Sequence, residues 1–157
     1  MERPAPLVLD ASIVVKWFVS ELDSPDALKI RDAHTNQEIS LFAPDLLVYE
    51  LANALRFRSS ITSSDLKEEI ESLFELDIAL ISPTAHSQSL SAALARTLDI
   101  TVYEAAYLQL AQDLDCQLIT SDKRFHEKAR LSPPADDGLK KIAVLLKDYS
   151  AIEKRRN

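Results

Sequence analysis

The amino-acid sequence predicts a single α/β domain of three layers, in which helices cover both faces of a five-stranded parallel sheet. Five short runs of apolar residues are separated by longer segments whose apolar residues recur at helical spacing. These runs are apolar throughout instead of alternating, which is typical of parallel strands buried on both faces. The chain has 157 residues, of which 46% are hydrophobic and 27% charged, so one domain can bury its own core.

Each element follows from a local pattern. We expect strands at five apolar runs, which cover residues 7–9, 40–43, 78–81, 118–120 and 142–146. Cap residues and prolines mark helix starts, as Ser24 does before Pro25. The expected helices cover residues 13–19, 24–37, 45–57, a segment that begins at 62–65, then 83–98, 102–114 and 121–129. Residues 1–150 form the domain, with a loop at 132–138, and residues 151–157 form a charged tail.

Composition excludes several functional classes. The net charge of −7, from 18 basic and 25 acidic residues, argues against a general nucleic-acid coat protein. The single glycine, Gly138, excludes phosphate-binding loops that need several glycines. The single cysteine, Cys116, excludes an internal disulfide and fits a cytoplasmic location. No apolar run approaches the roughly 20 residues that cross a bilayer, and the amino terminus lacks a signal-peptide pattern, so we expect no membrane association.

Two aspartates stand where a parallel sheet places its ligands. Asp10 directly follows the first expected strand, and Asp122 follows the fourth by way of Thr120 and Ser121. Ligands of open parallel sheets bind beyond the carboxyl ends of the strands, so both carboxylates are candidate site residues. An aspartate at such a position is also common as a helix cap, and that alternative stays open for each of them.

Two glutamates are further candidates. Glu50 is the only charged residue in the stretch 46–55 of the helix expected at residues 45–57, and Asn53 lies three positions later on the same side. A buried, unpaired carboxylate is strongly destabilising, so we expect Glu50 to have a cationic or metal partner unless it lies on the surface. Glu104 stands three residues after Thr101, which is the spacing of a capping box, and this structural role is the alternative to a ligand role.

Four segments occur in a fixed order along the chain. They are Leu-Asp-Ala-Ser at residues 9–12, Pro-Asp-Leu-Leu-Val-Tyr-Glu-Leu-Ala-Asn-Ala-Leu at 44–55, Thr-Val-Tyr-Glu-Ala-Ala-Tyr-Leu at 101–108 and Leu-Ile-Thr-Ser-Asp-Lys-Arg-Phe at 118–125. Together they resemble the PIN-domain ribonucleases, and among them the VapC-type toxins of toxin–antitoxin pairs. The resemblance spans about residues 7–146 and implies that one or two divalent ions are surrounded by four acids: Asp10, Glu50, Glu104 and Asp122.

The resemblance has two further implications. The third acid is usually aspartate in that family, so Glu104 departs from the pattern. The family's strand order is 3-2-1-4-5, which would place the first and fourth strands on either side of the point where the order reverses.

The chemistry of these side chains agrees with a metal site. Crowded carboxylates need cations, and oxygen ligands without a histidine or cysteine cluster favour Mg²⁺ or Mn²⁺. Such an ion polarises a phosphodiester and generates a hydroxide nucleophile. We expect nearby polar groups to orient the ligands: Ser12, Asn53, Thr120 and Ser121. We also expect basic side chains near the acids to bind RNA phosphates: Lys16, Arg56, Arg58, Lys123 and Arg124. The alternative is that each of them is an ordinary solvated surface residue.

The sequence therefore predicts a metal-dependent endoribonuclease of the cytoplasm, which we expect to form a homodimer and to be restrained by a VapB-type antitoxin. An arginine or lysine of the antitoxin would reach the acids, while its helix packs on apolar faces that carry Trp17, Phe18 and Leu55. One alternative is a degenerate PIN domain that only binds RNA or a partner. A haloacid-dehalogenase-type phosphatase would need a second aspartate where Ser12 stands, and a phosphate-accepting receiver domain would need one where Ser82 stands.

Overall fold

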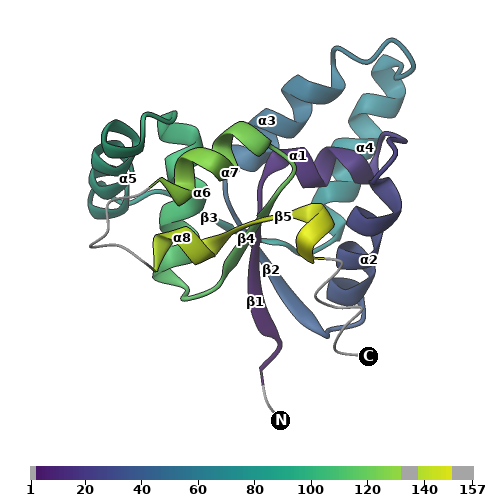
Figure 1. The fold of residues 1–157 in the computed structure, drawn as a ribbon. Coiled ribbons are helices and arrows are strands. Elements are labelled where there is room, and N and C mark those ends of the chain that lie inside the picture. Colours follow the sequence, from purple (N-terminus) through teal and green to yellow (C-terminus); the bar gives the residue numbers. More distant parts are fainter. Residues whose placement is uncertain (1–2, 132–137, 150–157) are drawn as a thin grey trace.

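The computed structural model describes residues 3–131 and 138–149, whose strands form one parallel sheet in the order β3-β2-β1-β4-β5 (Figure 1). The strands are β1 (Ala5–Leu9), β2 (Ile39–Pro44), β3 (Ala79–Ile81), β4 (Gln117–Thr120) and β5 (Ala143–Leu145). Neighbouring strands run parallel because each connection crosses over through helices. The structure thus confirms the predicted class and strand order.

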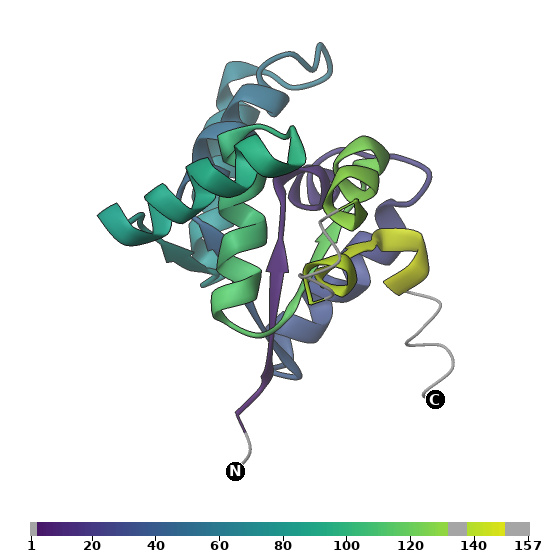
Figure 2. The ribbon, with the colours of Figure 1, turned by 60° about the vertical axis from the view of Figure 1, so that its left-hand side comes forward.

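Helices form the two outer layers of the domain. Between β1 and β2 lie α1 (Ala11–Val14), the 3-10 helix η1 (Val15–Trp17) and α2 (Ser24–Thr35), and α3 (Leu46–Leu55) and α4 (Ser63–Glu75) precede β3. Helices α5 (Ala85–Leu98) and α6 (Val102–Asp113) lead to β4, and α7 (Lys123–Arg130) and α8 (Leu139–Ile142) lead to β5. In Figure 1, α2 and α4 lie on one side of the sheet and α5, α6 and α8 on the other. Helix α6 packs against β1, β2 and β4, and Figure 2 shows it alongside β1.

The core brings two strand ends together. Val8 and Leu9 of β1 are buried, as are Leu118 and Ile119 of β4. Leu9 pairs with Ile119, so the carboxyl ends of β1 and β4 lie side by side. The chain moves outward from β1 to β3 and then crosses to β4 on the other side of β1. The strand order therefore reverses between β1 and β4, which is where open α/β sheets bind their ligands.

The carboxyl-terminal strand differs from the prediction. The apolar run at residues 142–146 is a strand only from Ala143 to Leu145, and α8, which was not predicted, precedes it. Leu139 is buried, and α8 packs against α6 and α7, so tertiary contacts stabilise a helix of only four residues. One helical turn carries too little periodicity to be detected in the sequence. Residues 132–137 of the expected loop and the expected tail at 151–157 lie outside the described residues.

Two helices begin or continue differently from the prediction. The helix expected at residues 121–129 begins at Lys123, because the Asp122 side chain caps it by accepting the Phe125 N–H at 2.9 Å. The segment expected as one helix at residues 13–19 is α1 followed by η1.

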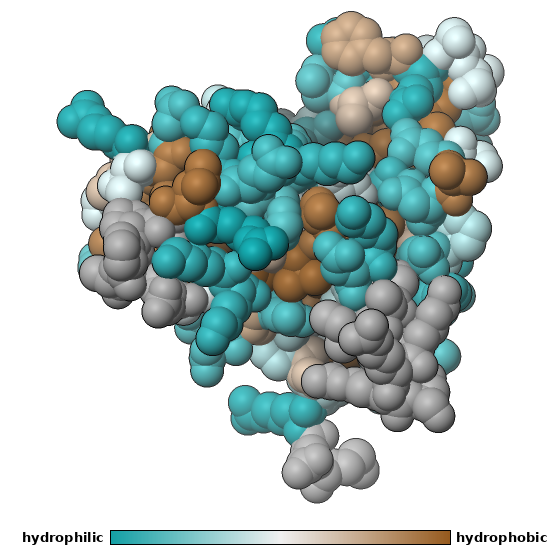
Figure 3. Space-filling view, viewed as in Figure 1, coloured by the Kyte–Doolittle hydropathy of each residue, from teal (hydrophilic) through white to brown (hydrophobic). Residues whose placement is uncertain are grey.

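In the part of the chain that the structure describes, no helix is long and apolar enough to span a bilayer. The face drawn in Figure 3 is mostly hydrophilic, with separate apolar patches.

Candidate active site

All four predicted acids line one cavity of about 220 Å³, which we call the acidic cavity. Asp10 follows β1 and Asp122 follows β4, so the strand pairing brings these two together. Glu50 comes from α3, and Glu104 comes from the first turn of α6. The cavity lies at the reversal point of the sheet, and it gathers side chains that are up to 112 residues apart in the chain, from Asp10 to Asp122.

Asp10 is the most deeply buried of the four acids. Only 8% of it is exposed, and its Oδ1 accepts the backbone N–H of Ser12 at 3.0 Å as well as the Ser12 hydroxyl. Burial raises the pKa of Asp10 from 3.8 to about 6, against the lowering effect of hydrogen bonds from Ser12 and Thr120, and the charge of Asp122 raises it further. The cavity therefore disfavours negative charge on Asp10 when no cation is beside it.

Glu50 is held by a tyrosine that the sequence analysis missed. The Tyr107 hydroxyl donates to Glu50 Oε1 at 2.9 Å, and Tyr107 is only 1% exposed. Burial raises the pKa of Glu50, the bond from Tyr107 opposes this, and the charges of Asp10 and Glu104 add to it. This bond connects α6, which carries Tyr107, to α3, which carries Glu50.

A sequence signal for Tyr107 does exist. Tyr107 lies three residues after Glu104, so both side chains project from the same side of α6. Burial and the neighbouring charge of Glu50 raise the pKa of Tyr107 above its ordinary value, so its hydroxyl stays a hydrogen-bond donor to Glu50. This spacing, in a helix that already carries a candidate acid, could have marked Tyr107 as part of the site.

Glu104 has the capping role that was kept as an alternative. Its Oε2 accepts the Thr101 N–H at 2.7 Å and the Thr101 hydroxyl at 3.0 Å, while the Thr101 hydroxyl accepts the Glu104 N–H at 3.1 Å. The other carboxylate oxygen, Oε1, lies 3.8 Å from a guanidinium nitrogen of Arg124. Glu104 nevertheless lines the acidic cavity, so capping the helix does not remove this side chain from the site.

The predicted supporting hydroxyls connect the two central strand ends. The Ser12 hydroxyl accepts the Ser121 N–H at 2.8 Å, and the Thr120 hydroxyl accepts the Asp122 N–H at 3.0 Å. Ser12 and Thr120 themselves lie 3.5 Å apart. Asn53 is placed differently, since it is exposed on α3 and its Oδ1 accepts from Arg56 at 2.8 Å. Ser12 and Thr120 are thus built into the site, whereas Asn53 lies at its edge.

A second cavity of about 490 Å³ adjoins the acidic one, and we call it the adjoining cavity. The two share Ser12, Glu50 and Asp122 in their walls. Lys16 and Arg58 also line the adjoining cavity, but both are held by carboxylates that the sequence analysis did not single out. Lys16 donates to Glu21 at 2.6 Å and to Asp23 at 2.7 Å, and Arg58 donates to the other oxygen of Glu21 at 2.8 Å.

The remaining predicted cations are spread over the rim. The Arg56 guanidinium lies 4.0 Å from the centre of the Phe57 ring. Lys123 lines a small cavity of about 90 Å³ together with Ser121, and Arg124 faces Glu104. None of these three side chains is among those lining the acidic or adjoining cavity in the described residues.

The prediction that Trp17, Phe18 and Leu55 lie on faces that bind the antitoxin is wrong for two of these three residues. Leu55 is completely buried, and Trp17 is 9% exposed with its indole N–H donating to the Ala27 carbonyl at 2.9 Å. Both belong to the core, and Phe18 is only partly exposed against it. An apolar helix face packs on the protein's own core first, because burying it there is what stabilises the fold.

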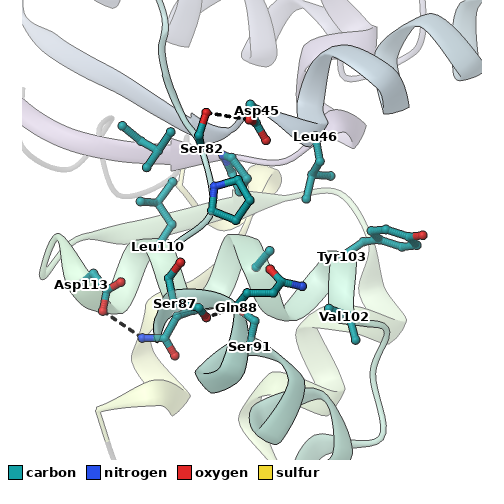
Figure 4. A pocket seen from close by; sticks show the side chains of 15 residues that line it. Asp45, Leu46, Ser82, Ser87, Gln88, Ser91, Val102, Tyr103, Leu110 and Asp113 are labelled. Carbon is teal, nitrogen blue, oxygen red and sulfur yellow. Dashed lines mark hydrogen bonds between the residues drawn. The ribbon is translucent and has the colours of Figure 1, made fainter. Parts of the chain in front are cut away.

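A third cavity, of about 270 Å³, holds none of the predicted residues (Figure 4). It lies between the ends of β2 and β3, the start of α3, and helices α5 and α6, and its walls include Leu46, Ile81 and Val102. Ser82 donates to Asp45 at 2.8 Å at one end, and Gln109 donates to Asp113 at 2.8 Å at the other. The acidic cavity is smaller than this one, but it carries the chemistry-bearing groups.

The donor set of the acidic cavity suits a hard divalent cation. Its walls carry four carboxylates and neither histidine nor cysteine. In residues 3–131 and 138–149, no three acid, histidine or cysteine side chains are grouped so that they could hold an ion as placed. One oxygen each of Glu104 and Asp122 accepts a backbone N–H at a helix start. Their other oxygens, with Asp10 and Glu50, are the candidate ligands, and a cation among them would reverse the rise in the pKa of Asp10.

Comparison with known proteins identifies the class that this fold and site define. Residues 7–131 match the family model of the PIN domain, and this chain therefore belongs to the PIN-domain family, in its VapC-type branch. It is 32% identical over 126 residues to Ribonuclease VapC3 of Pyrobaculum aerophilum, an alignment that covers 78% of this chain and 93% of that protein. The crystal structure of PAE2754 from Pyrobaculum aerophilum has a TM-score of 0.65, with 96% of each chain covered and 17% identity, and it supports the fold alone. These matches favour the PIN interpretation over a phosphatase or a receiver domain.

Proposed function

We propose that this protein is a metal-dependent endoribonuclease and the toxin of a VapBC-type toxin–antitoxin pair. The observation that carries the proposal is the acidic cavity, where Asp10, Glu50, Glu104 and Asp122 meet at the reversal point of the sheet. Its similarity to Ribonuclease VapC3 supports the choice of RNA as substrate. Scattered acids of no function would not be expected to line one cavity, because crowding carboxylates destabilises the fold unless a cation is present.

In this proposal Asp10, Glu50 and Asp122 would hold a Mg²⁺ or Mn²⁺ ion, one or two per site, with Glu104 contributing Oε1. Such an ion, when bound, lowers the pKa of a water molecule and polarises the phosphodiester. The protein's own contribution is to hold the ligands in place. Ser12 and Thr120 orient Asp10, and Tyr107 orients Glu50.

The RNA must approach a chain whose net charge is −7, so local cations have to offset the repulsion. Arg56, Lys123 and Arg124 are exposed at the rim, where they can contact phosphates. Lys16 cannot act as a freely exposed contact, since it is only 7% exposed and bound to two carboxylates. Contacts of this kind make RNA affinity fall as salt rises.

RNA cleavage with Mg²⁺, with Mn²⁺ and with a chelator tests the proposal directly. We expect wild-type protein to cut RNA with either ion, to be inactive with the chelator, and to lose activity in Asp10→Asn. Asp32→Asn on the exposed surface of α2 is the matched control and should keep full activity. Cleavage that survives both the chelator and Asp10→Asn would contradict the proposal.

The antitoxin needs a surface other than the one expected from sequence. Four aromatic side chains of the described residues are largely exposed, and three of them belong to α3, α4 or the segment between them: Tyr49 (78%) on α3, Phe57 (70%) just after it, and Phe74 (58%) on α4. We propose that a VapB-type antitoxin packs an apolar helix here and extends an arginine or lysine toward the acidic cavity. Pull-down with the product of the neighbouring gene should show association at micromolar concentration. If the two proteins do not associate, the toxin assignment is contradicted, whereas the nuclease proposal is not affected.

A homodimer is proposed from a different surface. Ile81, Val102 and Tyr103, all exposed, line the cavity of Figure 4, and burying apolar side chains favours association. Light scattering should give twice the monomer mass of 17.6 kDa, and Tyr103→Glu should lower it to that mass. A wild-type monomer at 100 μM would contradict this part of the proposal.

A binding-only PIN domain is the second candidate function. It is favoured by the capping role of Glu104 and by the lack, among the described residues, of a group of three ligands already placed around one ion. The cleavage assay separates the two candidates, since a protein that binds RNA but shows no metal-dependent cleavage supports the binding-only function.

A further inference from the structure

The adjoining cavity has the size and position of a nucleotide site. Its volume of about 490 Å³ falls within the range of roughly 300–1,000 Å³ that is usual for small-ligand sites. It shares Ser12, Glu50 and Asp122 with the acidic cavity, so a group bound in one borders a group bound in the other. A phosphodiester in the acidic cavity would therefore have one of its nucleotides in the adjoining cavity.

Two cations of the adjoining cavity form a network with carboxylates that is neutral in itself, while Glu50 and Asp122 add two more carboxylates to the cavity wall. Lys16 and Arg58 are paired with Glu21 and Asp23, so two positive and two negative groups form one network. Two carboxylates compensate the desolvation of the buried Lys16 ammonium. Because this network is neutral, the repulsion of phosphate in the adjoining cavity comes from the shared carboxylates Glu50 and Asp122, which the proposed cation would offset.

Arg58 has donors left for a ligand. Its side chain is 41% exposed, and its ion pair with Glu21 engages one nitrogen of the guanidinium. A guanidinium carries five N–H groups in a planar fork, which matches the geometry of a phosphate. Glu21 therefore orients Arg58 without using up its hydrogen-bonding capacity.

Ser121 provides an independent observation. Its hydroxyl is buried, and no hydrogen-bond partner for it exists among the described residues. Buried hydroxyls are nearly always hydrogen-bonded, so this one calls for an acceptor that the described residues do not supply. Ser121 lines both the adjoining cavity and the small cavity with Lys123, which places it between the two cationic surfaces.

We propose that the adjoining cavity binds the nucleotide next to the scissile phosphate of a single-stranded RNA. The phosphate of that nucleotide contacts Arg58 and Ser121, the base lies against Val15 and Ala54, and the base edge meets Asn53. This inference rests on the proposed nuclease function for the identity of the neighbouring group. It assigns the cavity a ligand class, a nucleoside monophosphate unit, and gives Arg58 and Ser121 a role in holding it.

Asn53 gives the site a base preference. Because its Oδ1 accepts from Arg56, its amide N–H₂ is the group presented to a ligand. An N–H₂ donor pairs with the keto oxygens of uracil and guanine, whereas cytosine and adenine present amino donors at the equivalent position. We therefore expect uridine and guanosine monophosphates to bind more tightly than cytidine and adenosine monophosphates.

Nucleoside monophosphates are suitable probes because they contain no phosphodiester that could be cut. NMR titration of the full chain with each of the four, in Mg²⁺, should give millimolar binding with the keto bases favoured at least threefold. Arg58→Gln should weaken all four at least fivefold and Ser121→Ala at least threefold, while Asn53→Ala should remove the ranking and leave the average affinity nearly unchanged. Arg31→Gln, on a partly exposed arginine of α2 that is paired with Asp32, is the control and should match wild type.

Stability measurements separate binding from folding. Ser121→Ala removes a buried hydroxyl without a partner, so its melting temperature should equal or exceed that of wild type while its nucleotide affinity falls. Equal affinities in wild type, Arg58→Gln and Ser121→Ala would overturn the inference, as would weakening by Arg31→Gln to the same extent. RNA cleavage by the same proteins tests the function separately. Wild type that binds monophosphates but cuts no RNA would contradict the nuclease and still support the nucleotide site.

Discussion

Replacing Asp10 by asparagine should stabilise the protein in the absence of metal, although it removes a proposed ligand. Asp10 is 8% exposed, and burial raises its pKa to about 6. A carboxyl group whose pKa is raised in the folded state binds protons more tightly there than in the unfolded chain. Stability from this group is therefore highest at low pH and falls as pH rises from its unfolded pKa of 3.8 through about 6.

The magnitude follows from the two pKa values. Each pKa unit corresponds to about 1.4 kcal/mol, so the ionised Asp10 destabilises the folded protein by roughly 3 kcal/mol above pH 7. Roughly half of this, about 1.4 kcal/mol, develops between pH 5 and pH 7.5. An asparagine Oδ1 can still accept the Ser12 N–H, so the substitution retains that hydrogen bond while removing the charge.

The assay is urea denaturation with EDTA at pH 5 and pH 7.5. The free energy of unfolding of Asp10→Asn should exceed that of wild type, and the difference should grow by roughly 1–1.5 kcal/mol between the two pH values. Comparing the difference at both pH values cancels titrating groups that do not interact with Asp10. Glu50 does interact with it, because the charge of Asp10 raises the pKa of Glu50, so removing that charge adds to the growth in the same direction. Asp32→Asn, from the exposed surface, should show no such growth.

The opposite result would refute the reasoning. If Asp10→Asn is less stable than wild type by about 2 kcal/mol at both pH values, Asp10 is a structural helix cap and not a destabilised ligand. A stabilised but inactive variant is the combination that the metal-site proposal requires.

The remaining predictions concern the other members of the site. Adding Mn²⁺ should raise the melting temperature of wild type, with a gain of about 2.7 kcal/mol at 100 times the Kd, and the Asp10→Asn/Asp122→Asn double variant should lose most of that gain in thermal-shift measurements. Glutamate is one methylene longer than the aspartate usual in the family, which displaces its carboxylate from the position that the strict octahedral geometry of Mg²⁺ requires. Mn²⁺ should therefore support faster cleavage than Mg²⁺, and Glu104→Asp should narrow the ratio of the two rates. An unchanged rate ratio, with stability lower by a few tenths of a kcal/mol, would assign Glu104 to capping alone. Tyr107→Phe removes the bond to Glu50 and should lower kcat at least tenfold with KM unchanged, at a stability loss of about 1 kcal/mol; an unchanged kcat would leave Tyr107 a packing residue.

The sequence alone determined the class of fold and the elements that build it. Apolar runs such as Leu7–Leu9 mark buried strands, and cap spacings such as Thr101 to Glu104 mark helix starts, because both depend on neighbours along the chain. The resemblance to a family then supplied the strand order and the four acids. The structure confirms the strand order and brings the four acids to one cavity.

Local patterns were less successful where tertiary packing decides. The helix α8 is too short to show a period, and it exists because Leu139 is buried against the helices around it. The sequence pattern around Trp17 and Leu55 is the same whether these side chains contact a partner or the core. In this structure both are buried in the core. The hydrophobicity of a side chain predicts that it will be buried, but only the fold determines whether the core or a partner protein buries it.

Partners across the site were decided only by the tertiary structure. Tyr107 and Glu50 are 57 residues apart, and Arg58 and Glu21 are 37 apart, so no spacing in the sequence predicts either pair. The same holds for Ser121, whose buried hydroxyl has no hydrogen-bond partner in the part of the chain that the structure describes. Hydrogen bonds and ion pairs form over about 3 Å, a distance that folding sets between elements and that no local pattern encodes.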